Sequence, residues 1–100
     1  MNKSVKLLSY LNPDEAHVED MAAYVYGDDS AASQTKVLHV VKYLMRMGWH
    51  ICRREYFYSL HEDHYELAQK FLACKREKGA FRITPQNVAA QLKDELLSVG

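Results

Sequence analysis

The sequence predicts a mainly helical domain with one small β-hairpin and two additional helices at its C-terminal end. Apolar residues recur at helical spacing in several segments, and two short runs rich in aromatic and branched residues lie within positions 50–60. A length of 100 residues suffices for one core. We therefore expect a first unit of residues 1–60 and a helical extension of residues 61–100 that packs on the same domain.

Two helices are predicted in the first 27 residues. Ser4 is placed to cap the first helix, and Pro13 ends it because the residue before a proline avoids helical angles. The second helix is indicated by a buried face at i, i+3, i+4 and i+7 followed by a terminating glycine: Val18, Met21, Ala22, Val25 and Gly27. The pattern leaves open whether this helix begins at Pro13 or only near Glu19.

A third helix is predicted from about Gln34 to Met47, with Ser33 as its N-cap and Gly48 as its stop. Its apolar residues trace one stripe, formed by Val37, Val40, Val41, Leu44 and Met47. At about 100° per residue, the opposite face carries Thr35, His39, Lys42, Tyr43 and Arg46, with Lys36 at its edge. Trp49 follows directly, and we expect it to fold back onto the core.

A hairpin is predicted next, with strands over residues 50–53 and 56–60 joined by a turn around Arg54 and Glu55. Two strands of this length are not stable alone, so they must lie against the helices. A fourth helix is then predicted over residues 61–78, ending at Gly79, with one face formed by Tyr65, Ala68, Phe71 and Leu72.

A fifth helix begins with Thr84 as N-cap and Pro85 at its first position, and Ile83 is placed to pack on Val88 as a hydrophobic staple. Its apolar face continues through Leu92, Leu96 and Val99. Two amphipathic helices after a finished domain either complete its core or pair with a second copy, and we expect a homodimer through them.

Charge is distributed unevenly along the chain although its formal net charge is zero. Residues 1–30 contain two lysines and six acidic side chains, a net charge of −4, whereas residues 31–60 contain five basic side chains and one acid, a net charge of +4. The basic segment coincides with the third helix and the hairpin. Such a dipole favours an anionic partner for this middle third, because cationic patches attract polyanions.

The segment of residues 18–60 resembles the winged helix-turn-helix effector domains of bacterial response regulators. The motifs that carry the resemblance are Tyr26-Gly27-Asp28-Asp29 at the end of the second helix, Ser33-Gln34-Thr35 at the start of the third, and Arg53-Arg54-Glu55-Tyr56-Phe57-Tyr58-Ser59-Leu60 in the hairpin. The hairpin lacks the glycine that those domains usually have, we expect no receiver domain before it, and two helices are predicted after it. The resemblance therefore does not imply the regulation by a receiver domain that is typical of that family.

The order of elements and the charge pattern predict a sequence-specific transcription regulator that binds double-stranded DNA. Residues near the start of the third helix would meet base edges, and those further along would meet phosphates. The expected contacts are Ser33, Gln34, Thr35, Lys36, His39, Lys42, Tyr43, Arg46, Arg53 and Arg54. The rival interpretation is a protein-binding module of the same shape, an adaptor or an inhibitor of a host complex, which the zero net charge favours.

Other chemistry has weaker support in the sequence. His61 and His64 with Cys52 and Cys74 would make a Cys2His2 zinc set, but the cysteines are isolated rather than paired closely, which favours free thiols and exposed histidines. No nucleophile-base pair, glycine-rich phosphate loop or catalytic carboxylate pair is present, so we expect neither an enzyme nor a cofactor. Without a membrane-spanning run or a signal peptide, the expected location is cytoplasmic.

Overall fold

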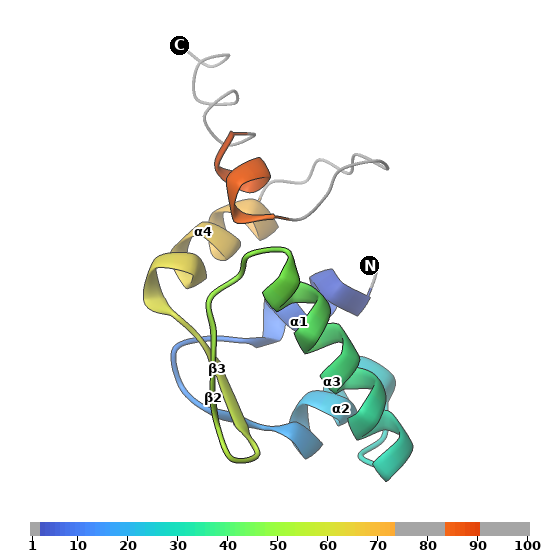
Figure 1. Cartoon of the computed structure of the whole chain (residues 1–100). Coiled ribbons are helices and arrows are strands. Elements are labelled where there is room, and N and C mark those ends of the chain that lie inside the picture. Colours follow the sequence, from blue (N-terminus) through green and yellow to red (C-terminus); the bar gives the residue numbers. More distant parts are fainter. Residues whose placement is uncertain (1–2, 74–83, 91–100) are drawn as a thin grey trace.

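The computed structural model describes residues 3–73 and 84–90 of the chain. Helices dominate it, and a small antiparallel sheet lies beside them (Figure 1). The elements are α1 (Lys3–Tyr10), β1 (Ala16–His17), α2 (Val18–Tyr26), α3 (Ala31–Arg46), β2 (Ile51–Arg54), β3 (Phe57–Leu60) and α4 (Glu62–Ala73), and residues 85–90 are also helical. The predicted mainly helical architecture with a small hairpin is confirmed.

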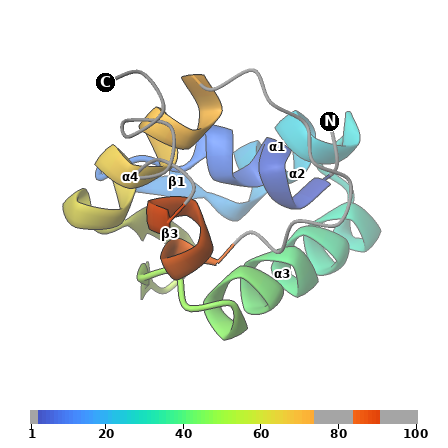
Figure 2. The same ribbon diagram turned by 90° about the horizontal axis from the view of Figure 1, so that it is seen from above.

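The core lies where α1, α2 and α3 meet one another. Viewed from above, α1 and α2 lie on the inner side of α3, whose outer side is open (Figure 2). Side chains with almost no exposure fill this junction: Leu7, Leu8, Leu11, Met21, Ala22, Val37, Val41 and Leu44. Trp49 is also buried and belongs to the same core, as the sequence predicts.

The start of α1 differs from the prediction. Ser4 lies inside the helix, which already includes Lys3, so the prediction that Ser4 is the N-cap is wrong. An N-cap residue must have non-helical backbone angles, and Ser4 does not occupy such a position. The helix ends at Tyr10, before Pro13 as predicted, and the Asn12 side-chain oxygen accepts a hydrogen bond from the Asp14 amide at 2.7 Å.

The predicted second helix is confirmed as α2, with its four apolar residues buried. It begins at Val18, and the His17 ring caps it by accepting a hydrogen bond from the Glu19 amide at 3.1 Å. Gly27 ends it in the left-handed conformation with φ 83°, and its amide donates to the Ala23 carbonyl. This backbone angle suits glycine because a Cβ atom would add strain there.

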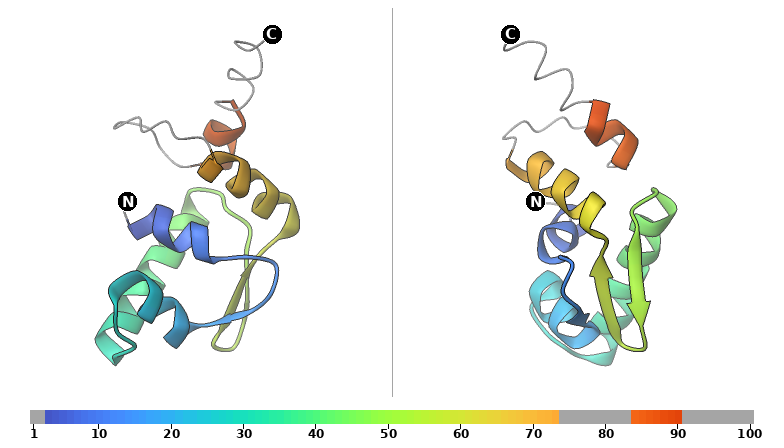
Figure 3. Two further views of the ribbon diagram at one scale, coloured as in Figure 1. Left: turned by 180° about the vertical axis from the view of Figure 1, so that it is seen from behind. Right: turned by 90° about the vertical axis from the view of Figure 1, so that its left-hand side faces the viewer.

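The sheet has three strands in the order β1-β3-β2, all antiparallel. Sequence analysis missed β1, a two-residue strand in which Ala16 pairs with Tyr58 and His17 with Phe57. The connection between α1 and β1 runs beside β3, where the Leu60 amide donates to the Asn12 carbonyl at 2.9 Å (Figure 3). The hairpin is therefore attached to the N-terminal part of the chain along one of its edges.

The predicted third helix forms but begins earlier than expected. Its N-cap is Ser30, whose side-chain oxygen accepts a hydrogen bond from the Ser33 amide, so the assignment of Ser33 as the cap is wrong. Ser33 occupies the third position of α3 instead and is buried. Two serines three residues apart give the same capping signal in the sequence, and the turn after Gly27 is short enough to use the first one.

The predicted hairpin is confirmed, with its first strand shifted by one residue at both ends and its second strand beginning one residue later than expected. Arg54 pairs with Phe57, so only Glu55 and Tyr56 form the turn. Glu55 has a φ of 56°, the one non-glycine residue with positive φ among those described. The Val18 amide donates to the Tyr56 carbonyl at 2.9 Å, which fastens the tip of the hairpin to the start of α2.

The C-terminal helices are described only in part. α4 begins at Glu62, Ala68 is fully buried, and Tyr65 and Phe71 are partly buried as predicted, whereas residues 74–79 lie outside the described residues. The predicted cap of the last helix is confirmed, because the Thr84 hydroxyl accepts from the Asn87 amide at 3.1 Å. Other predicted positions of that helix lie outside the described residues: Ile83, Leu92, Leu96 and Val99.

We expect Glu55→Gly to stabilise the fold. Positive φ costs a side-chain-bearing residue roughly 1–2 kcal/mol, and the greater freedom of glycine in the unfolded chain offsets about half of this. Urea unfolding followed by circular dichroism should show a gain of up to about 1 kcal/mol. The matched change Glu66→Gly, on the exposed side of α4, should instead lower stability by about 1 kcal/mol; equal losses for both variants would contradict the strained turn.

Candidate nucleic-acid interface

The outer side of α3 is an exposed cationic surface. Burial of Val37, Val41 and Leu44 fixes the rotation of the helix about its axis, so the opposite side faces solvent. The residues predicted for that side are all exposed, namely Thr35, Lys36, His39, Lys42, Tyr43 and Arg46. The helix contains no acidic residue, so nothing on α3 itself neutralises this charge.

Several of these side chains have no partner within residues 3–73 and 84–90. The side chains of His39, Lys42, Tyr43 and Arg46 form no hydrogen bond or ion pair within these ranges. His39 is followed at three and four residues by Lys42 and Tyr43, and these in turn by Arg46, which places all four on one side of the helix. No described residue therefore occupies their polar groups, and Tyr43 is 39% exposed.

The turn that precedes α3 carries the opposite charge. Asp28 accepts hydrogen bonds from the Ser30 amide at 2.9 Å and from the Ser33 hydroxyl at 2.7 Å. Hydrogen bonds from Ser30 and then Ser33 lower the pKa of Asp28 from 3.8 to about 2, with a further contribution from the charge of Lys36. Asp28 is thus a fixed negative charge beside the helix N-terminus, where the helix dipole also favours it.

The predicted DNA contacts nearest the start of α3 form hydrogen bonds with neighbouring residues of the chain. Ser33 is 4% exposed and its hydroxyl is used by Asp28, so Ser33 is a structural residue. Gln34 donates from Nε2 to the Asp29 carbonyl at 2.8 Å, and the Thr35 hydroxyl donates to the Ala31 carbonyl at 3.0 Å. Gln34 keeps Oε1 as an acceptor and its second Nε2 hydrogen as a donor, whereas Thr35 Oγ1 keeps only its lone pairs as acceptors.

A lysine pair around Tyr26 extends the cationic surface beyond α3. Lys36 Nζ lies 5.8 Å from the centre of the Tyr26 ring, and Lys3 Nζ lies 4.2 Å from it. Cation-π attraction of this kind holds both ammonium groups near the ring face. Sequence analysis missed Lys3, which it counted with the acidic first third, because no local pattern shows that α1 packs beside α3.

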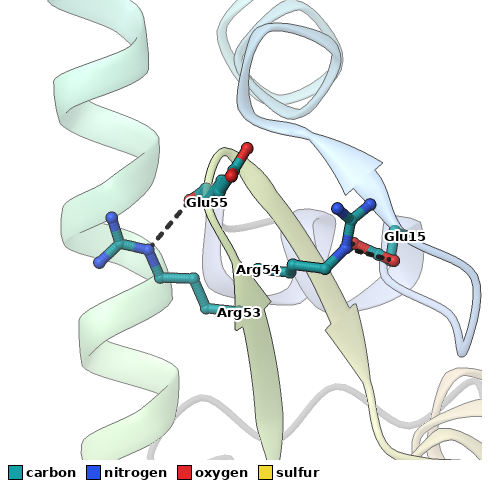
Figure 4. A network of polar contacts seen from close by, with 4 residues as sticks. All are labelled: Glu15, Arg53, Arg54 and Glu55. Carbon is teal, nitrogen blue, oxygen red and sulfur yellow. Dashed lines mark hydrogen bonds and ion pairs between the residues drawn. The ribbon is translucent and has the colours of Figure 1, made fainter.

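The two arginines of the hairpin extend to opposite sides of the sheet (Figure 4). Arg53 shares its strand face with Ile51, donates from Nε to the Glu55 carbonyl at 3.1 Å, and extends toward the side along which α3 runs. Arg54 lies on the other face, where its Nε binds both carboxylate oxygens of Glu15 at 2.9 and 3.0 Å. Successive residues of a strand alternate between faces, so both arginines cannot serve one surface.

The charge segregation expected from the sequence is therefore incomplete in space. Glu15 reaches Arg54, and Asp28 and Asp29 directly precede α3, so part of the acidic N-terminal third adjoins the basic segment. Among the described residues, the cationic side chains that form no ion pair with these acids include those on the outer side of α3 and Arg53 of β2, which extends toward the side along which α3 runs (Figure 4). We call this set the α3 face: Thr35, Lys36, His39, Lys42, Tyr43, Arg46 and Arg53.

Within residues 3–73 and 84–90, no three His, Cys, Asp or Glu side chains are grouped so as to hold a metal ion. Cys52 is an exposed free thiol on β2, whereas Cys74 lies outside the described residues. No described helix has the length and apolar character required to cross a bilayer.

No protein-family model, curated protein or solved structure matches this chain. The likeness to response-regulator effector domains thus rests on the sequence motifs alone. A function must be argued from the charges, contacts and exposure of the chain's own residues.

Asp28→Asn should destabilise the protein in a pH-dependent way. The pKa of Asp28 is lowered in the fold, so its stabilising contribution is complete above pH 3.8 and is lost as the pH falls through about 2. Urea unfolding should show the variant weaker than the wild type at pH 6, with the difference disappearing near pH 2. Asp29→Asn is the matched control; if it shows the same pH-dependent loss, the assigned role of Asp28 is wrong.

Proposed function

We propose that this protein is a sequence-specific DNA-binding regulator with a winged helix-turn-helix fold. In this proposal α3 is the recognition helix, α2 is the supporting helix, and the β2–β3 hairpin is the wing. The order helix, strand, helix, helix and two strands, with the hairpin beside α3, supports it. The protein acts by binding, without catalysis or a cofactor.

One observation carries the proposal: the outer side of α3 combines positive charge, exposure and side chains without a hydrogen-bond partner among the described residues, at His39, Lys42, Tyr43 and Arg46. A helix fits into the major groove, which is about 12 Å wide. Lys42 and Arg46 lie one turn apart with no acid between them on α3, which suits contacts to successive phosphates. A solvated surface helix usually carries charges of both signs, so the absence of acids favours a polyanionic partner.

The acids Asp28 and Asp29 before α3 determine how the helix would lie on DNA. Asp28 would be repelled by phosphates, so we place the contacts from Thr35 onward rather than at the helix tip. Thr35, Lys36 and His39 would face base edges, while Lys42, Tyr43 and Arg46 reach the backbone. Arg53 is the wing contact, whereas Ser33 and Arg54 serve internal bonds instead.

Dimerisation through the C-terminal helices belongs to the same proposal. A two-fold dimer would double the contact surface and require half-sites related by the same symmetry. Tyr65, Leu67 and Phe71 give α4 an apolar side that is only partly covered by the described residues. Selection of binding sites from random duplexes should therefore yield a palindromic consensus.

A protein-binding role is the second candidate, and the acids around the basic segment favour it. Asp28 and Asp29 at the start of α3, and the neutralisation of Arg54 by Glu15, give this region a mixed charge that suits a protein partner. Heparin chromatography near neutral pH separates the two candidates. Salt-dependent retention supports DNA binding, while elution without retention supports the protein-binding role.

The double change Lys42→Ala and Arg46→Ala should weaken binding to random-sequence duplex DNA and reduce its dependence on salt. Each phosphate contact contributes about 0.9 to the slope of log K against log salt, so the slope should fall by about 2. Fluorescence anisotropy at several salt concentrations measures this. Lys70→Ala, which removes a lysine from the exposed end of α4, should change neither value; an unaltered slope in the double variant would refute the proposal.

A further inference from the structure

Three histidines meet where the hairpin joins α4. His50 directly precedes β2, His61 directly follows β3, and His64 lies in the first turn of α4. The rings of His50 and His61 are stacked with centres 4.6 Å apart and planes 2° apart. The His64 ring stands edge-on to His50 at 6.2 Å, so the three imidazoles form one contiguous group.

His64 also holds a backbone hydrogen bond that links α4 to the start of β2. The His50 amide donates to His64 Nδ1 at 2.7 Å, which requires the neutral ring with its hydrogen on Nε2. The backbone continues this connection, because the His61 amide donates to the His50 carbonyl at 2.9 Å and the Tyr65 amide donates to the His61 carbonyl. The hydrogen bonds between α4 and the start of β2 therefore require the neutral form of His64.

The surroundings of His64 also disfavour its charged form. Burial lowers the pKa of His64 first, and the charges of His50 and His61 lower it further, while Asp63 acts in the opposite direction. Asp63 also lies 3.8 Å from His61. These are the charged and titratable groups that act on His64 from the described residues; α1, which also packs on α4, contributes none.

We propose that His50, His61 and His64 form an acid-sensitive latch that holds α4 against the hairpin at neutral pH and releases it on protonation. A proton on Nδ1 of His64 removes the acceptor and leaves the His50 amide without its partner. This inference does not depend on DNA binding, since it concerns only how α4 is attached.

The direction of the pH dependence follows from linkage. The pKa of His64 is lower in the fold than its ordinary 6.5, so the latch is complete above about pH 6.5 and weakens as the pH falls below it. The elements packed around α2 and α3 contain none of the three histidines and should remain folded. We therefore expect α4 to detach at low pH without unfolding of the rest of the protein.

Hydrogen exchange of the full chain, corrected for the intrinsic pH dependence of exchange, tests the latch. Between pH 7.5 and pH 5, protection of α4 amides should fall several-fold while protection of α3 amides stays unchanged. Trp49, the single tryptophan, lies 5.6 Å from the His64 ring, and its fluorescence should change over the same pH range. Unchanged α4 protection in the wild type would overturn the proposal.

His64→Asn is the decisive variant, because Asn Oδ1 occupies the place of Nδ1 and accepts a hydrogen bond at every pH. It should keep α4 protected at pH 5. His39→Asn, at an exposed position of α3, is the matched control and should behave as the wild type. Loss of α4 protection at pH 5 in both variants would contradict the latch.

If His64→Asn does not fold, NMR of the ring nitrogens in the wild type tests the proposal instead. The latch requires a neutral His64 with its hydrogen on Nε2 at pH 7.5, and any other form would overturn it.

Discussion

The contact of α3 with α1 and α2 determines which side of α3 faces solvent. Val37, Val41 and Leu44 are buried in it, and turning the helix to expose them would force a lysine or arginine into the core. Burial of an unpaired charge costs many times the gain from one apolar side chain, so the helix has one stable rotation. The cationic character of its outer side is a consequence of that packing.

The same contact positions the hairpin and α4. At the end of α3 the chain reverses at Gly48, which has a φ of 107°, and the buried Trp49 fixes where the next strand begins. His50 follows at once, so the start of β2 and the histidine group are set by the helix that precedes them. Pro85 lies against the same reversal, 3.5 Å from where a Cβ on Gly48 would stand. The packing of α3 on α1 and α2 therefore positions both the α3 face and the group of His50, His61 and His64.

Sequence analysis predicted the parts of this fold that depend on long periodic patterns. The buried face of α2 and the exposed face of α3 follow directly from helical spacing, since each pattern extends over several turns. Very short elements, and contacts between residues far apart in the sequence, leave no recognisable pattern in it. β1 has two residues, the cap of α3 depends on a choice between Ser30 and Ser33, and Arg54 meets Glu15 across 39 residues of sequence. Counting charges along the chain therefore overstated their separation in space.

Mapping of DNA contacts by NMR would test the central claim most directly. On addition of duplex DNA to the isotopically labelled protein, the claim predicts shift changes concentrated at Thr35, His39, Lys42 and Arg46 of α3, with a smaller set at Arg53 on β2. The exposed side of α4 and the Glu15–Arg54 side of the sheet should be unaffected. No change on α3 at low salt, or changes confined to those other surfaces, would contradict the account.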